Sequence, residues 1–152
     1  MARYWLVKTE PSTYSIDDLA RDGSTGWEGV RNYLARNHLR EMALEDRVIV
    51  YHSNALPPAA VGLARVARTA YPDPTQFDTS SDYYDEKSPV DAPRWDRVDL
   101  AFVERWPRAV PLDALKADPA LVGLELVRKG SRLSVFPVSE AHFAHLCALG
   151  RG

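Results

Sequence analysis

The chain has 152 residues and a mass of 17.0 kDa, a size typical of one domain that folds without disulfides or structural metals. Its formal net charge of −2 argues against a broad electrostatic grip on duplex nucleic acid, but it is compatible with a pocket for one nucleotide. The single cysteine, Cys147, excludes an internal disulfide and an all-cysteine zinc site. No apolar run is long enough to span a bilayer and the N-terminus lacks signal-peptide features, so we expect a cytoplasmic protein without membrane contact.

The first third of the chain predicts a strand and two helices. Residues 4–8 form a short apolar run that is typical of a buried strand. A helix follows, with Ser15 as its N-cap, Asp18 at capping-box spacing and Gly23 at its end. Asn32 is a good N-cap for a second helix. The apolar face of that helix consists of Ala35, Leu39 and Met42.

The remaining two thirds predict further short strands between short helices. The predicted strands are 46–53, 61–69, 95–106 and 133–136, and the predicted helices are 110–118 and a final one capped by Ser139. Residues 71–95 read as a long loop rich in Pro, Asp, Ser and Tyr, which is usually functional or mobile. The order of elements lacks a regular βαβ repeat, so we expect one α+β domain over residues 1–152, built on a small curled sheet or β-barrel.

The segment around Trp27 is the first candidate site. An indole face can stack on a base, and Glu28, Arg31 and Asn32 offer groups that could read base edges or hold a phosphate at a helix N-terminus. The alternative is structural: Trp27 closes the end of the sheet and Asn32 only caps its helix.

Polar residues at strand ends give three further candidates, each with a structural alternative. Thr9 and Glu10 follow the first strand and either face a cavity or form a plain turn. Tyr51 and His52 end another strand, where a turn is again the simpler interpretation. Arg132 and Ser134 share one face of a late strand, and Arg132 either reaches a phosphate or pairs with an acid.

No catalytic residue, metal ligand set or cofactor site is expected. His142, His145 and Cys147 lie close together on the last helix, but no second pair of ligands lies upstream, so surface and packing roles are favoured. No nucleophile elbow or paired acid and base is present.

Taken together, these segments resemble the EVE domain, a family related to the thymocyte nuclear proteins. The resemblance covers residues 3–149 and rests on YWLVKTEP, GWEGVRNYLARNHLREM, RVIVYHSN, GLARV with AYPDP, YYDEKS and RLSVFPV, in that order. It implies a PUA-like β-barrel with peripheral helices, a fold shared with YTH readers of methylated RNA. Members of the family are implicated in recognising modified bases, notably 5-methylcytosine and 5-hydroxymethylcytosine in DNA, and some act alongside restriction systems.

The resemblance also implies a set of base-binding residues and a set of partners. By matching segments, the pocket consists of Thr9, Glu10, Trp27, Val30, Arg31, Asn32, Tyr51, His52, Arg132, Leu133 and Ser134. Trp27 would stack on the base, Glu10 and Asn32 would read its edges, and Arg31 or Arg132 would hold phosphate. The expected partners are modified DNA or RNA, with a restriction or repair protein as a further candidate. The chain departs from the family at Thr9, Leu34 and Glu86, where Ser, Gln and Pro are common.

The sequence is compatible with four functions. The leading hypothesis is a non-enzymatic reader of a modified base, which binds duplex DNA weakly and in a salt-sensitive way because its net charge is negative. The alternatives are an RNA-binding module, an enzyme that uses Glu10 or His52 as acid or base, and a protein-interaction module with a vestigial pocket. The sequence does not predict the oligomeric state.

Overall fold

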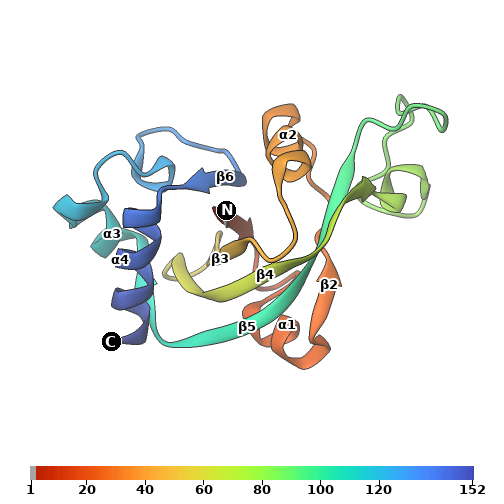
Figure 1. Cartoon of the computed structure of the whole chain (residues 1–152). Coiled ribbons are helices and arrows are strands. Elements are labelled where there is room, and N and C mark those ends of the chain that lie inside the picture. The colour runs from red at the N-terminus through yellow and green to blue at the C-terminus, as the bar shows by residue number, and fades with distance from the viewer. Residues whose placement is uncertain (1–2) are drawn as a thin grey trace.

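The computed structural model describes residues 3–152, which form six strands, four α-helices and three short 3-10 helices (Figure 1). In chain order these are β1 (Tyr4–Thr9), α1 (Ile16–Asp22), β2 (Ser24–Gly26), α2 (Tyr33–Glu41), β3 (Arg47–His52), β4 (Ala59–Pro72), η1 (Pro74–Phe77), β5 (Asp96–Pro111), α3 (Leu112–Ala117), η2 (Pro119–Leu121), η3 (Glu125–Val127), β6 (Val135–Val138) and α4 (Glu140–Arg151). No helix in this part of the chain is long and apolar enough to cross a membrane.

The six strands form one mixed sheet in the order β2-β5-β4-β3-β1-β6. Strands β1 and β3 are parallel, and the other neighbouring pairs are antiparallel. The α+β class is therefore confirmed. The expected barrel does not close, because β2 and β6 are the two edges of the sheet and do not pair with each other over residues 3–152. The long strands β4 and β5 instead bend, and their register shifts at several β-bulges give the sheet its curl.

The curled sheet carries a hydrophobic core on each face. Successive side chains of a strand point to opposite faces, and β1 divides accordingly: Trp5 and Val7 belong to one core and Leu6 to the other. The first core is covered by α1 and α2, through Leu19 and Leu39 among others. The second core is covered by α3 and α4. A sheet covered on both faces leaves its strand ends as the places where polar side chains can gather.

The helices begin where their capping residues predict. Ser15 and Asp18 form the expected capping box at the start of α1, and Gly23 is the C-cap. The side chain of Asn32 accepts a hydrogen bond from the Ala35 backbone at the start of α2. Ser139 caps α4 in the same way. Local hydrogen bonding therefore accounts for both helices that flank the first core.

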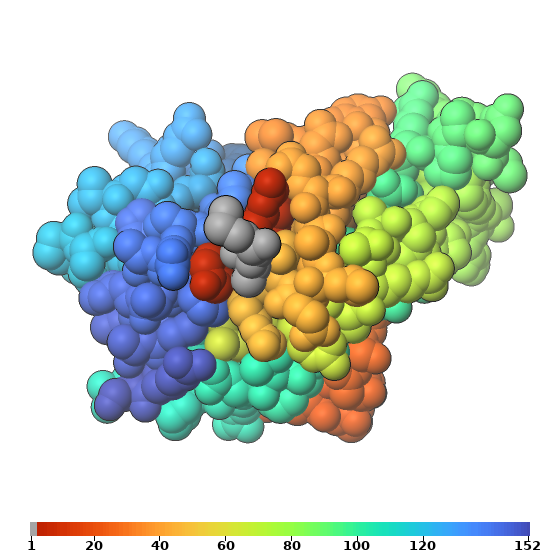
Figure 2. Space-filling view, in the orientation of Figure 1, coloured from red at the N-terminus to blue at the C-terminus, as the bar shows by residue number. Residues whose placement is uncertain are grey.

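The segment 73–95 extends beside α2 at the far end of β4 and β5 (Figure 2). One buried amide, that of Gln76, holds its two ends together. The Gln76 Nε2 group donates to the carbonyls of Asp73 and Trp95, both at 2.7 Å. Its Oε1 atom accepts from Ser88 Oγ at 2.5 Å and from the Trp95 backbone at 3.1 Å. Four bonds from a single side chain give this long connection a defined path and place Tyr83 against the rest of the molecule.

Candidate functional site

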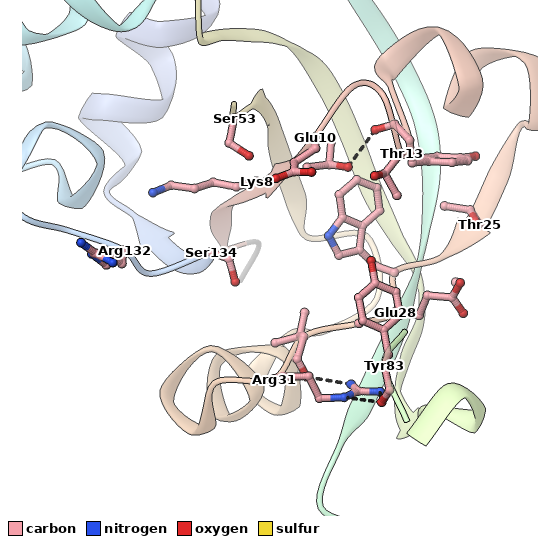
Figure 3. Close-up of a pocket in the computed structure, with 16 residues that line it drawn as sticks. Lys8, Glu10, Thr13, Thr25, Glu28, Arg31, Ser53, Tyr83, Arg132 and Ser134 are labelled. Atoms are coloured by element: carbon pink, nitrogen blue, oxygen red, sulfur yellow. Dashed lines mark hydrogen bonds between the residues drawn. The ribbon is translucent and has the colours of Figure 1, made fainter. Parts of the chain in front are cut away.

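A cavity of about 570 Å³ lies where β1 and β3 end side by side (Figure 3). These strands are parallel and pair Thr9 with His52, so their carboxyl ends lie next to each other at the same end of the sheet. The Ser53 backbone N–H donates to the Thr9 carbonyl at 2.9 Å and holds the two ends together. The loop after β2 supplies another wall, and its Trp27 backbone N–H donates to the Val98 carbonyl of β5 at 2.7 Å.

The cavity brings together predicted site residues from three distant parts of the chain. They come from the end of β1, the loop between β2 and α2, and the loop before β6. These residues are Thr9, Glu10, Trp27, Val30, Arg31, Arg132 and Ser134. Contact of any of them with a base stays a prediction at this stage, whereas their convergence on one cavity is a property of the fold.

Asn32 lies outside the cavity wall, and the structure gives it a different role. Its side-chain oxygen accepts the Ala35 N–H at 3.0 Å, which satisfies one of the free donors at the start of α2. The structural alternative considered for this residue is therefore the one observed. Reading of a base edge by Asn32 has no support from this arrangement.

Tyr51, His52 and Leu133 also lie outside the cavity wall. Tyr51 is buried in the second core, and Leu133 packs against both cores. The His52 Nε2 atom accepts the Ile16 backbone N–H at 3.0 Å and so ties the start of α1 to the end of β3. Burial lowers the pKa of His52, although the negative charge of Asp17 opposes the shift. Within the protein these three residues therefore have packing and positioning roles, and their contact with a base stays a prediction.

Arg31 lines the cavity, but its guanidinium is fully used inside the protein. Nε and Nη2 both donate to the Tyr83 carbonyl, at 3.0 and 2.9 Å. Nη1 donates to the Val30 carbonyl at 2.9 Å and to the Asp73 carboxylate at 3.1 Å, and Nη2 donates to the Thr75 hydroxyl at 3.0 Å. An arginine has five N–H donors, and all five are engaged. Arg31 therefore cross-links two loops, and a phosphate contact by this residue would require the loss of one of these bonds.

Asp73 is the buried centre of this cross-link. Its carboxylate accepts the Gly29 N–H at 2.9 Å, an Arg31 N–H, and both the N–H and hydroxyl of Thr75, at 2.9 and 2.6 Å. Burial alone would raise the pKa of Asp73, but the hydrogen bonds from Thr75, Gly29 and Arg31 outweigh it and hold the pKa below its usual value. The ionised carboxylate fixes the Trp27 loop against the segment 73–95.

Tyr83 is an aromatic residue of the cavity wall that the sequence does not predict. Its ring lies against Gly29, where a Cβ atom would come within 2.6 Å of the ring carbons. Gly29 also has a φ of +84°, a conformation that favours glycine. The three tyrosines of the segment 71–95 were the only available signal, since nothing local indicates which of them reaches the site.

Other wall residues outside the predicted set come from the same strand ends and loops. They are Lys8, Thr13, Tyr14, Thr25, Gly26, Glu28, Gly29 and Ser53. Glu28 was weighed as a group that reads a base edge, and here it forms an ion pair of 3.2 Å with Arg97 of β5. The same arginine donates to the Tyr71 hydroxyl at 2.7 Å, so Glu28 is held at the rim of the cavity.

Trp27 belongs both to the hydrophobic core and to the cavity wall, and its stacking on a base stays a prediction. It is 7% exposed and belongs to the first core, and it also lines the cavity. Tyr14 packs against it edge-on, with ring centroids 6.2 Å apart and planes at 89°. This packing fixes the indole plane. Trp27 is therefore a rigid part of the wall.

The polar side of the cavity is built from β1 and its turn. The Thr9 hydroxyl donates to the Tyr14 carbonyl at 2.7 Å, which fixes its orientation. Glu10 is exposed, and its carboxylate has only a long contact of 3.4 Å from the Asn54 amide. Burial lowers the pKa of the Lys8 ammonium, an effect that the charge of Glu125 opposes. Glu10 thus presents an acceptor group at the cavity, whereas the Lys8 ammonium lies 6.0 Å from the centroid of the Tyr51 ring.

Comparison with known proteins places this architecture in a family. The EVE domain matches residues 3–149 of the chain. Mouse thymocyte nuclear protein 1 is 40% identical over 168 residues, which cover 98% of this chain and 74% of the mouse protein.

Two solved structures are closely similar in fold. A protein from Pseudomonas putida is 49% identical with a TM-score of 0.94, covering 96% of this chain and 98% of that one. The human THYN1 protein in complex with 5-methylcytosine containing DNA is 35% identical with a TM-score of 0.93, covering 99% of both chains. The family match spans residues 3–149, which include every residue of the cavity wall, so the chain belongs to the EVE domain family.

Proposed function

We propose that the cavity binds a 5-methylcytosine base in DNA. One observation carries this proposal: a single cavity combines the aromatic side chains of Trp27 and Tyr83, the apolar side chain of Val30 and the free carboxylate of Glu10. An aromatic wall supports base stacking, which contributes about 1–3 kcal/mol per base. The DNA complex of the human relative supports the choice of ligand.

The polar groups of the cavity suit the edge of cytosine. Its exocyclic N4 amino group donates hydrogen bonds, and a glutamate carboxylate such as that of Glu10 accepts them. The N3 and O2 atoms accept hydrogen bonds, for which Lys8 and the hydroxyls of Thr13, Ser53 and Ser134 are available donors. The 5-methyl group is apolar, so its contact with Val30 or an aromatic ring removes apolar surface from water and strengthens binding.

The base must leave the duplex to enter such a cavity. Base flipping costs a few kcal/mol, which is comparable to the free energy that stacking of the base on an aromatic side chain contributes. The net charge of −2 limits the help from backbone contacts. We therefore propose that the protein binds an unpaired or mismatched 5-methylcytosine more tightly than one in a perfect duplex.

Binding without chemistry is the mode that the cavity supports. The enzyme hypothesis relied on Glu10 or His52 as acid or base, and His52 neither lines the cavity nor has a free Nε2 lone pair. Glu10 has no second acidic or basic side chain within hydrogen-bonding distance among residues 3–152, its one partner being the Asn54 amide. Recovery of unaltered 5-methyldeoxycytidine after incubation with excess protein is the expected result, and a new nucleoside product would overturn it.

The test of base reading compares 5-methylcytosine with thymine. The two bases share the methyl group and differ at positions 3 and 4, where 5-methylcytosine has an acceptor N3 and a donor amino group and thymine has a donor N3–H and an acceptor O4. Matched DNA single strands with one central 5-methylcytosine or thymine are titrated against the wild type, Glu10→Gln and Glu140→Gln. Glu140 is exposed at the start of α4 and lines no part of the cavity.

The wild type is expected to prefer the 5-methylcytosine strand, because the Glu10 carboxylate accepts from N4. Glu10→Gln is expected to reduce that preference about five- to tenfold, since an ionised acceptor forms the stronger hydrogen bond. Glu140→Gln is expected to behave as the wild type. An unchanged preference in Glu10→Gln would remove Glu10 from the base edge, and a preference for matched RNA strands would favour the RNA-binding alternative.

A further inference from the structure

A second cavity of about 410 Å³ adjoins the first, and the two share Lys8. Its wall contains four cationic side chains, which are Lys8, Lys116, Arg128 and Lys129. Tyr51, Leu112 and Leu126 contribute apolar surface to the wall of this second cavity. The two cavities therefore meet at the Lys8 side chain.

Residues 128–132 form the boundary between the cavities, and we call them the cationic ridge. Its sequence is Arg-Lys-Gly-Ser-Arg. Arg132 faces the first cavity, whereas Arg128 and Lys129 line the second. Gly130, with a φ of +78°, makes the turn between them. In Figure 3, Lys8 and Arg132 extend on the same side of the cavity, away from Thr13 and Thr25.

The charges of this region are poorly neutralised. Within residues 3–152, Lys8, Lys116, Lys129 and Arg132 have no ion-pair partner, and Arg128 has only a contact of 3.5 Å with Glu125. Arginines elsewhere are commonly paired, as Arg40 is with Asp96 at 2.5 Å and Arg105 is with Asp17 at 2.9 Å. A chain of net charge −2 thus presents several cationic side chains without an ion pair beside the two cavities, with Glu125 as the acid that acts on Lys8 and Arg128.

We propose that the cationic ridge and the second cavity bind backbone phosphates of the DNA strand whose base occupies the first cavity. The proposal rests on the proposed function. A phosphate is covalently linked to the nucleoside, so it must lie next to the base, and Lys8 connects the two cavities. Arg31 is not free for this contact because its five donors are engaged. Lysine ammonium groups and arginine guanidinium groups are the usual phosphate partners in proteins.

The test separates phosphate contacts from base contacts. Two ligands are used: a short single strand with one 5-methylcytosine, followed by fluorescence anisotropy, and free 5-methyldeoxycytidine, which carries no phosphate, followed by tryptophan fluorescence. The proteins are the wild type, Lys129→Ala, the double variant Arg128→Ala/Lys129→Ala, and Lys129→Arg as a charge-conserving variant. Arg108→Ala is the matched control, because Arg108 is exposed on β5 and lines neither cavity.

For a single strand, each phosphate contact contributes about 0.7 to the slope of log affinity against log salt concentration. We expect Lys129→Ala to lower the slope for the oligonucleotide by about 0.7 and the double variant by about 1.4. Lys129→Arg and Arg108→Ala are expected to keep the wild-type slope. All variants are expected to bind the free nucleoside as the wild type does.

The outcomes distinguish the two proposals. A double variant with the wild-type salt slope would overturn the phosphate site, whatever the nucleoside result. A wild type that binds the oligonucleotide through the ridge but never binds the nucleoside would support the phosphate site and contradict the base cavity. A wild type that binds neither ligand would overturn both proposals.

Discussion

Arg31 lines the cavity while its side chain is bonded entirely within the protein. Its guanidinium joins the Trp27 loop to the segment 73–95 through bonds to residues up to 52 positions away. It also lies 5.7 Å from the centroid of the Tyr83 ring and 5.5 Å from that of Trp95. The residue therefore positions one aromatic wall of the cavity, and its charge is balanced by Asp73.

Asp73→Asn is expected to destabilise the protein by about 2 kcal/mol, because a buried charge-assisted network loses its acceptor charge. Asp78→Asn is the matched control. Asp78 makes the same turn, with the Ser80 N–H at 2.9 Å and its hydroxyl at 2.6 Å, but it is exposed and has no arginine partner. Urea unfolding at neutral pH measures both variants. Equal losses would show that the turn, and not the link to Gly29 and Arg31, is what stabilises this region.

The same pair of variants has a pH signature. The folded-state pKa of Asp73 lies below its unfolded value of about 3.9, so its contribution to stability is complete above that value. It is lost as the pH falls through the folded-state pKa. The difference in unfolding free energy between the wild type and Asp73→Asn should thus be constant near neutral pH and shrink in acid below about pH 4.

At the scale of elements, the site depends on how loops are held at strand ends. Gly29 allows Tyr83 to pack against the backbone of the Trp27 loop. Gly29→Ala is expected to displace Tyr83 and weaken binding of a 5-methylcytosine strand about tenfold, the loss of one stacking contact. Gly23→Ala is the control, since Gly23 has nearly the same φ, +82°, with no atom within 4 Å of its missing Cβ.

Both glycine variants pay a similar backbone cost of about 1–2 kcal/mol, which thermal unfolding measures. Only Gly29→Ala should lose affinity, and Tyr83→Ala should lose a similar amount. Because both changes act through one contact, the double variant should bind no worse than either single variant. Additive losses, or normal binding by Gly29→Ala, would show that Tyr83 is not a wall for the base.

Elements with local signals were predicted from the sequence, and elements defined by distant contacts were not. The caps at Ser15 and Ser139 form bonds within a few residues, so their helices could be located from the chain alone. Strand β2 has only three residues and exists because it pairs with β5. Strand β6 begins at Val135, two residues later than predicted, because its bounds follow its pairing with β1.

The candidate site divides along the same line. The strand ends at Thr9 and Glu10 were recognisable because polar residues follow an apolar run. Asn32 was ambiguous, since an asparagine that caps a helix and one that reads a base have the same sequence context. The cross-linking role of Arg31 and the presence of Tyr83 in the wall could not be predicted, because their partners lie across the fold.

At the scale of the whole molecule, the faces of the curled sheet carry the hydrophobic cores and the ends of its strands carry the cavity. Both faces of the sheet are covered by hydrophobic cores, so the cavity forms at the end of the sheet, where β1 and β3 terminate. Overall charge gives no hint of the ligand, because the net charge is negative while the ridge of residues 128–132 carries three cationic side chains beside the cavities. This distribution is what a protein that binds one nucleotide and its adjacent phosphates requires.

The most direct test of the central claim compares 5-methylcytosine with cytosine in otherwise identical DNA single strands. Calorimetric titration of the wild type at one fixed salt concentration measures both affinities. Burial of one methyl group contributes about 0.8 kcal/mol, so the methylated strand should bind about fourfold more tightly, with 1.4 kcal/mol corresponding to a factor of ten. Equal affinities would contradict the account, because a cavity that contacts the base in the proposed way must sense the methyl group.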